Sequence, residues 1–265
     1  MRIGLFDSGV GGLTVLKKVF ELCPNSSFIY LADTARLPYG VKTSTEITQI
    51  AEEISFWFSK QSIDVFLVAC NTTNAIALDV IKNKLNVPVF DLIDSASSTI
   101  KESRVGILAT PSTVRTKAYT NSILSFHPTT FVIEQSCPEF VPMIEMDSIN
   151  SNEISAIAIR YLQPLLEEKI ESLVLGCSHY PLITPLLTEL LPSNVRLIDP
   201  AETLSLKLKL FMDSKKCDFA KKKNLVDSKF CVTADPKNFS IRTKHWLNVF
   251  PEVNLVSLQK KGCVS

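Results

Sequence analysis

The chain repeats its own pattern once, and this repeat constrains the fold more than any other feature. Residues 2–8 (RIGLFDS) match residues 104–110 (RVGILAT), with a basic residue, a β-branched residue, a glycine, two apolar residues, a variable residue and a hydroxyl. Three further segments have a counterpart in the same order: residues 28–31 with 131–134, 63–70 with 170–177, and 87–91 with 195–199. Four ordered matches indicate two copies of one structural plan.

Each repeated segment is short, rich in β-branched residues and bounded by turn residues, which is typical of a strand. The segments between them carry apolar residues at helical spacing, for example at residues 47–58 and 154–162. Apolar strands that alternate with amphipathic helices predict parallel sheets covered on both faces. We therefore predict an α/β fold of two similar domains, with mainly parallel sheets flanked by helices and a pseudo-twofold axis between them.

The last 60 or so residues have no counterpart in the repeat. They contain a strand-like segment at residues 230–234 and a candidate edge strand near residues 255–258. We expect this tail to close back on the first copy. The predicted domains are therefore residues 1–96 plus 206–265, which form a discontinuous first domain, and residues 97–205, which form the second.

Composition excludes several classes of partner. With 28 basic and 27 acidic side chains the formal net charge is +1, so the chain lacks the basic excess of a nucleic-acid binder. The one basic stretch, residues 214–229, is interpreted as a solvated surface. No apolar run is long enough to span a membrane, and Asp7 interrupts any signal-peptide core. We expect a cytoplasmic protein that binds neither membranes nor nucleic acid.

The cysteines are expected to be free thiols. Their number is odd and no two have the C-x-x-C spacing. The same lack of paired spacing predicts that no metal is bound. They are Cys23, Cys70, Cys137, Cys177, Cys217, Cys231 and Cys263. Only Cys70 and Cys177 occupy matching positions in the two copies, and each is followed by polar residues. The other five are interpreted as packed or exposed side chains.

The paired thiols indicate a reaction with two faces. In parallel α/β sheets, ligands bind beyond the carboxyl ends of the strands, where Ser8, Cys70, Thr110 and Cys177 are expected to lie. Inversion of a stereocentre needs a proton to leave one face of a carbanion and another to arrive on the opposite face. Thiols, with an ordinary pKa of about 8.5, suit both roles. Alternatively, a cysteine that ends a buried strand is only a small apolar core residue.

The loops after the strands suit a small zwitterion. Residues 7–12 (DSGVGG) follow a strand and open a helix, so backbone N–H groups and a hydroxyl can meet a carboxylate. The loop lacks the nucleotide fingerprint, since Thr14 stands at its last glycine position. A glycine turn needed only for packing is the alternative. Residues 110–113 (TPST) are the counterpart in the second copy, and the turn-rich residues 33–40 (DTARLPYG) are expected to cover the cleft.

These motifs resemble those of glutamate racemases, in the cofactor-independent aspartate/glutamate racemase family. The resemblance covers residues 1–205 well and the tail more loosely. Six motifs carry it: residues 6–13 (FDSGVGGL), 33–40 (DTARLPYG), 69–72 (ACNT), 110–114 (TPSTV), 140–145 (FVPMIE) and 175–182 (LGCSHYPL).

The resemblance implies an enzyme that interconverts L- and D-glutamate without a cofactor and supplies D-glutamate for peptidoglycan. Cys70 would take the α-proton of D-glutamate, assisted by Asp7. Cys177 would take that of L-glutamate, assisted by Glu145 and His179. The groups that would hold the substrate are Ser8, Pro38, Tyr39, Gly40, Asn71, Thr72, Thr110, Thr113 and Ser178. The carbanion would be stabilised by hydrogen bonds and electrostatics in a closed cleft.

Three departures from the family pattern stand near the site. Ser178 replaces the usual threonine, Asn74 replaces a small residue, and Ala32 replaces a glycine. The last two are expected to tighten or reshape the site.

Other functions stay open at this point. The substrate could be a related acidic amino acid such as aspartate. A hydrolase or lyase could use one cysteine with His179 as its base. A two-domain protein could close on a dicarboxylate without chemistry. The sequence does not determine the oligomeric state, and a homodimer is compatible with it.

Overall fold

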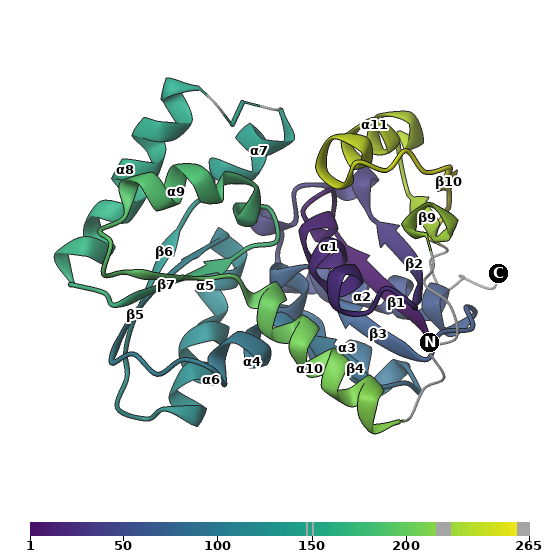
Figure 1. Cartoon of the computed structure of the whole chain (residues 1–265), viewed down its shortest axis with the longest axis horizontal. Coiled ribbons are helices and arrows are strands. Elements are labelled where there is room, and N and C mark those ends of the chain that lie inside the picture. Colours follow the sequence, from purple (N-terminus) through teal and green to yellow (C-terminus); the bar gives the residue numbers. More distant parts are fainter. Residues whose placement is uncertain (147, 150, 216–223, 259–265) are drawn as a thin grey trace.

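A computed structural model describes residues 1–146, 148–149, 151–215 and 224–258. These residues form two separate parallel sheets, each flanked by helices (Figure 1). The predicted α/β fold with two parallel-sheet units is confirmed. Cys217, Cys263 and half of the basic stretch lie outside the described residues. No helix within the described ranges combines the length and apolar character needed to cross a bilayer.

The first sheet has six strands in the order β10-β9-β2-β1-β3-β4, all parallel. Their bounds are β1 (Arg2–Asp7), β2 (Ser27–Ala32), β3 (Val65–Val68), β4 (Val89–Asp91), β9 (Lys229–Val232) and β10 (Val253–Leu255). Side chains alternate across the sheet, so Leu5 packs in one apolar cluster and Phe6 in another on the opposite face. Both faces of β1 are therefore buried, as its continuous apolar sequence predicts.

The second sheet has four parallel strands in the order β6-β5-β7-β8. They are β5 (Arg104–Ala109), β6 (Phe131–Ser136), β7 (Ser172–Gly176) and β8 (Arg196–Ile198). In the repeat, β5, β6, β7 and β8 correspond to β1, β2, β3 and β4. The order β6-β5-β7-β8 is therefore the same as the order β2-β1-β3-β4 in the first sheet. The sequence repeat therefore corresponds to a repeated sheet topology.

The helices follow the strands in the alternation that the apolar spacing predicts. The α-helices are α1 (Gly12–Leu22), α2 (Ser44–Ser59), α3 (Asn71–Lys84), α4 (Leu92–Ser97), α5 (Pro111–Thr116), α6 (Ala118–Phe126), α7 (Phe140–Glu145), α8 (Asn152–Glu167), α9 (Thr184–Leu190), α10 (Pro200–Ser214) and α11 (Pro236–Leu247). Short 3-10 turns are η1 (Thr34–Arg36), η2 (Tyr39–Val41), η3 (Tyr180–Ile183) and η4 (Leu225–Asp227).

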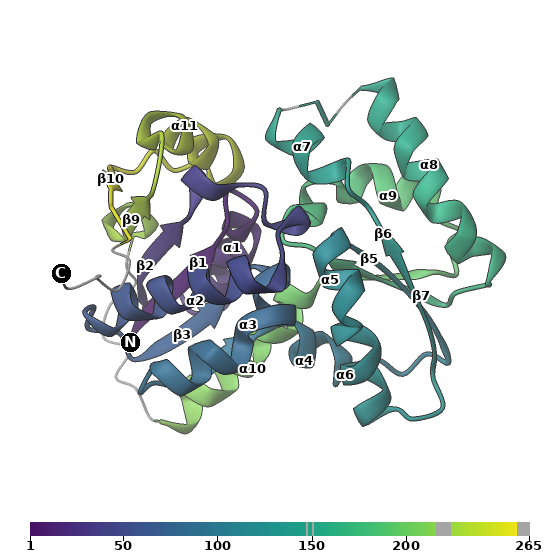
Figure 2. The ribbon, with the colours of Figure 1, turned by 180° about the vertical axis from the view of Figure 1, so that it is seen from behind.

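The tail returns to the first sheet. Strands β9 and β10 extend that sheet beyond β2, and α11 lies over the same end of the molecule (yellow in Figures 1 and 2). Helix α10 carries the chain back from the second sheet and packs against α1 and α4. Helices α4 and α10 each span one of the predicted domain boundaries. The division at residues 96/97 and 205/206 therefore stays a prediction.

Candidate active site

Cys70 and Cys177 follow corresponding strands, β3 and β7, and both line one cavity between the two sheets. The lining residues are Ser8, Leu37, Tyr39, Gly40, Cys70, Asn71, Thr72, Thr110, Val141, Cys177, Ser178 and His179. Ten of these twelve are candidates from the sequence. Because they come from the carboxyl ends of strands in both sheets, the cavity has one thiol from each repeat.

The cavity is small. Its volume is about 20 Å³, and a single water needs roughly 10–15 Å³. An amino acid does not fit into this space as it stands. The side chains or elements around the cavity must therefore move to admit an amino acid.

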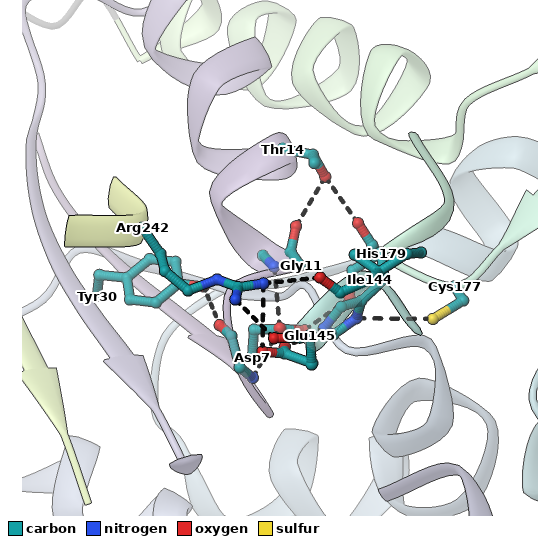
Figure 3. Close-up of polar contacts among 12 residues, drawn as sticks. Asp7, Gly11, Thr14, Tyr30, Ile144, Glu145, Cys177, His179 and Arg242 are labelled. Atoms are coloured by element: carbon teal, nitrogen blue, oxygen red, sulfur yellow. Dashed lines mark hydrogen bonds and ion pairs between the residues drawn. The ribbon is translucent and has the colours of Figure 1, made fainter. Parts of the chain in front are cut away.

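On one side of the cavity, Cys177 is linked to a partly buried ion pair (Figure 3). The Cys177 Sγ lies 3.9 Å from His179 Nδ1, and His179 Nε2 lies 2.6 Å from Glu145 Oε1. Burial alone would lower the pKa of His179, but its hydrogen bonds with Cys177 and Glu145 outweigh burial and raise that pKa well above the ordinary value. His179 is thus held as an imidazolium, whose positive charge attracts negative charge on the neighbouring sulfur.

On the other side, Cys70 has the opposite electrostatics. It is 4% exposed, and burial, followed by the negative charge of Asp7, raises the pKa of its thiol to about 12. Cys70 therefore carries its proton at neutral pH. The two thiols are equivalent in the topology but differ in surroundings, since Cys70 lies near the carboxylate of Asp7 and Cys177 faces the cation of His179.

Asp7 connects the two sides. Its Oδ2 accepts hydrogen bonds from the backbone N–H groups of Gly9 and Gly12, at 3.0 and 2.9 Å, and its Oδ1 accepts one from Ser178 Oγ at 3.0 Å. Burial raises the pKa of Asp7, although the charge of His179 and these hydrogen bonds act in the opposite direction. A carboxylate from the first sheet is thereby tied to a hydroxyl of the second.

The glycine turn after β1 allows the two halves to approach each other. A Cβ at Gly11 would lie 2.4 Å from His179 Nδ1 and 2.6 Å from Ser178 Oγ. A side chain there would push the imidazole away from its position. The glycine is thus required by the site, in addition to any role in packing helix against strand.

Hydroxyls gather at the starts of α3 and α5. Thr72 and Thr110 lie 3.0 Å apart through their Oγ1 atoms, and Thr113 Oγ1 lies 3.0 Å from that of Thr110. Thr113 does not line the cavity and contacts it only through this cluster. Asn71 accepts a 2.6 Å hydrogen bond from Tyr119. Hydroxyl and amide donors at two helix N-termini form a surface that suits a carboxylate.

The loop over the first sheet supplies Tyr39 and Gly40. The Tyr39 hydroxyl donates to Asp33, which is also held by Arg36 Nε at 2.6 Å and Thr233 Oγ1 at 2.8 Å. Pro38 is not among the lining residues, although its neighbours Leu37 and Tyr39 are.

The family departures have structural roles. Asn74 Nδ2 donates to the carbonyls of Val68, at 2.7 Å, and Cys70, at 2.9 Å, while its Oδ1 accepts from Leu92 N at 2.9 Å. Asn74 therefore fixes the turn that presents Cys70 and does not line the cavity. Ala32 is buried at the end of β2, beside Asp7 of β1.

Sequence reasoning missed four residues that support the site. The Thr14 Oγ1 lies 2.8 and 3.0 Å from the Gly11 and Ser178 carbonyls, which share its one donor hydrogen, so it also joins the two halves. Tyr30 donates to the carbonyl of Gly9 at 2.8 Å, and Tyr119 donates to Asn71. Arg242, on α11 in the tail, donates hydrogen bonds to the carbonyls of Glu145 and Ile144. None lies in a recognised motif, and no sequence signal points to them.

The fold and the site together define the class of protein: two repeated parallel-sheet units whose strand ends enclose a cavity lined by a pair of thiols. The model of the Asp/Glu/Hydantoin racemase family matches residues 3–205. The chain belongs to this family, and it is a racemase of the isomerase class.

Individual relatives agree with this assignment. The chain is 75% identical over 265 residues to a glutamate racemase of Prochlorococcus marinus (strain NATL1A), covering 100% of both chains. It is 46% identical over 255 residues to one of Synechococcus sp. (strain CC9605), covering 96% of each. A solved glutamate racemase from Francisella tularensis, in complex with D-glutamate, superposes with a TM-score of 0.90 at 32% identity, covering 97% of this chain and 98% of that one.

Proposed function

We propose that the protein interconverts L- and D-glutamate by transferring the α-proton between the substrate and the two thiols, Cys70 and Cys177. Its product would serve peptidoglycan synthesis in the cytoplasm. The observation that supports this most is the single cavity lined by two thiols from equivalent strands of two sheets. The names of relatives up to 75% identical favour glutamate as substrate.

The charges suggest how a turnover from L- to D-glutamate begins. In the proposed first step the thiolate form of Cys177, beside the His179 cation, takes the α-proton and becomes a thiol. The C–H electron pair stays on the α-carbon as a carbanion. Cys70, held as a thiol by burial and by Asp7, then delivers its proton to the opposite face and becomes a thiolate. The reverse reaction starts from this second state, so one proton is taken up and one is given in each direction.

Backbone and hydroxyl donors would hold the two carboxylates and stabilise the carbanion. Asn71 and Thr72 begin α3, and Thr110 caps α5, so both helix N-termini point partial positive charge at the cavity. Ser8 and Gly40 close the remaining sides. In the absence of bulk water such preorganised donors act more strongly on developing charge.

Aspartate is the competing substrate, since it is shorter by one methylene, a difference worth only about 1–3 kcal/mol in binding. The test is chiral chromatography of L-glutamate and L-aspartate after incubation with purified protein. We expect D-glutamate, formed faster than D-aspartate, and loss of racemisation in both Cys70→Ala and Cys177→Ala. A hydrolase or lyase that uses Cys177 alone would retain activity in Cys70→Ala. Folded protein that forms no D-glutamate would refute the proposal.

A further inference from the structure

Arg242 joins the C-terminal tail to the Cys177 side of the site. It lies on α11, beside the first sheet, and its guanidinium reaches the end of α7, beside the second (Figure 3). Arg242 Nη1 donates to the carbonyl of Glu145 at 2.6 Å, and Nη2 donates to that of Ile144 at 2.8 Å. Nη2 also lies 3.7 Å from Glu145 Oε2. One side chain thus contacts both the backbone and the carboxylate of Glu145.

These contacts have a simple physical basis. The last carbonyls of a helix have no partner within the helix, and α7 is only 6 residues long. The planar fork of a guanidinium can donate to two neighbouring carbonyls at once. The Arg242 side chain is 14% exposed, so these hydrogen bonds are largely shielded from water. The position of Glu145 is therefore determined by Arg242 as well as by α7 itself.

Glu145 in turn orients His179, and His179 faces the sulfur of Cys177. Its Oε1 accepts the 2.6 Å hydrogen bond from His179 Nε2, and the opposite ring nitrogen faces Cys177. Burial raises the pKa of Glu145, but the hydrogen bond from His179 and the charges of His179 and Arg242 outweigh burial and lower that pKa overall. Arg242 therefore also favours the ionised carboxylate that His179 needs.

We propose that Arg242 is a positioning residue for proton transfer at Cys177, acting through Glu145 and His179 across the gap between the two sheets. No contact of Arg242 reaches Cys70 within the described residues. Loss of Arg242 should therefore slow the Cys177 step much more than the Cys70 step. This inference rests on the two-thiol function proposed above.

The test compares primary isotope effects on kcat/KM with α-deuterated L-glutamate and α-deuterated D-glutamate. Cys177 breaks the C–D bond of the L-enantiomer, and Cys70 breaks that of the D-enantiomer. In Arg242→Gln we expect kcat/KM to fall by up to about 100-fold. The isotope effect should grow relative to the wild type for the L-enantiomer and shrink for the D-enantiomer. In Arg242→Lys, which keeps the charge without the fork, both changes should be smaller and in the same directions.

The matched control is Arg160→Gln. Arg160 pairs with Glu139, next to the other end of α7, but its side chain is 59% exposed. Among the described residues no hydrogen bond or ion pair joins Arg160 to His179. Its kcat/KM and both isotope effects should equal those of the wild type. Folding of each variant is checked by circular dichroism. If Arg242→Gln does not fold, the same kcat/KM values and isotope effects are measured on Arg242→Lys instead.

Three outcomes distinguish failure of the positioning role of Arg242 from failure of the proposed function. A folded Arg242→Gln with wild-type kcat/KM would overturn the inference, and so would a loss of activity that leaves the balance of the two isotope effects unchanged. The same holds for Arg242→Lys where it carries the test. A wild-type protein that does not racemise glutamate would instead overturn the proposed function itself.

Discussion

At the scale of single residues, the two thiols are unequal, although the repeat makes them equivalent. Cys70 is kept protonated by burial and by Asp7, while Cys177 faces the cation that Glu145 holds on His179. In the proposed mechanism one thiol of the pair acts as the base while the other supplies the acid. This is what a proton transfer across two faces needs at neutral pH.

The assignment of each thiol to one enantiomer predicts selective exchange in single variants. In Cys70→Ala, Cys177 should still remove the α-proton of L-glutamate, and deuterium from solvent should return to the same face. NMR in D2O should then show loss of the α-proton signal from L-glutamate, with none from D-glutamate and no racemisation. Cys177→Ala should show the mirror result. Equal exchange of both enantiomers in either variant would contradict the assignment.

The high pKa of Cys70 predicts a pH dependence for exchange of D-glutamate by Cys177→Ala. Only the thiolate removes a proton, and a pKa of about 12 leaves a small thiolate fraction at neutral pH. The initial exchange rate should rise about tenfold per pH unit from pH 7 to pH 9. A rate that is flat over this range would show that Cys70 is already ionised.

At the scale of elements, the turn between β1 and α1 sets the distance between the two halves of the site. Gly11→Ala should lower kcat by roughly 10- to 100-fold, because the added methyl group displaces His179. Gly106→Ala in β5 is the control. Its Cβ would lie 2.7 Å from the flexible end of Ile170, so we expect a loss of about 1 kcal/mol in stability without a change in kcat. Equal kcat values in both variants would refute this role of Gly11.

An ion pair next to β5 and β8 predicts a pH dependence of stability. The hydrogen bond from Arg196 is the main cause that lowers the pKa of Glu102 to about 2. Because this pKa lies below the unfolded value of about 4.3, the contribution is present above that pH and is lost as the pH falls towards 2. Both side chains are partly exposed, so it is below about 1 kcal/mol. Between pH 5 and pH 3 the thermal midpoint of the wild type should fall more than that of Glu102→Gln, and parallel curves would contradict this.

Much of the element order could be predicted from the chain alone. Apolar segments at matching positions predicted the parallel strands. The equivalence of Cys70 and Cys177 predicted which two thiols line the same cavity. The supporting contacts could not be predicted in this way. Arg242 lies on a helix in the tail, outside the repeat, and its partners are backbone carbonyls, which leave no trace in the sequence. Asn74 likewise hydrogen-bonds to main-chain groups, so the sequence did not reveal that it fixes the turn before Cys70.

At the scale of the whole molecule, the closed cavity implies movement. A volume of about 20 Å³ does not admit glutamate, so the elements around the cavity must move, and we expect the two halves to separate for binding and close again for chemistry. Contacts that cross the gap, such as those of Thr14 with Ser178 and of Arg242 with Glu145, favour the closed form. We expect small-angle scattering to give a smaller radius of gyration with D-glutamate than without it. An identical radius in both conditions would contradict closure by movement of the halves.

The central claim is that Cys70 and Cys177 invert the α-carbon of glutamate by removing and returning its proton on opposite faces. Its most direct test is incubation of L-glutamate with the purified wild-type protein in D2O, followed by chiral separation and mass spectrometry at early times. The account predicts that the D-glutamate formed carries deuterium at the α-carbon, while the remaining L-glutamate is almost entirely undeuterated. D-glutamate that keeps the original proton, or early deuterium in the recovered L-glutamate equal to that in the product, would point to one base and contradict the account.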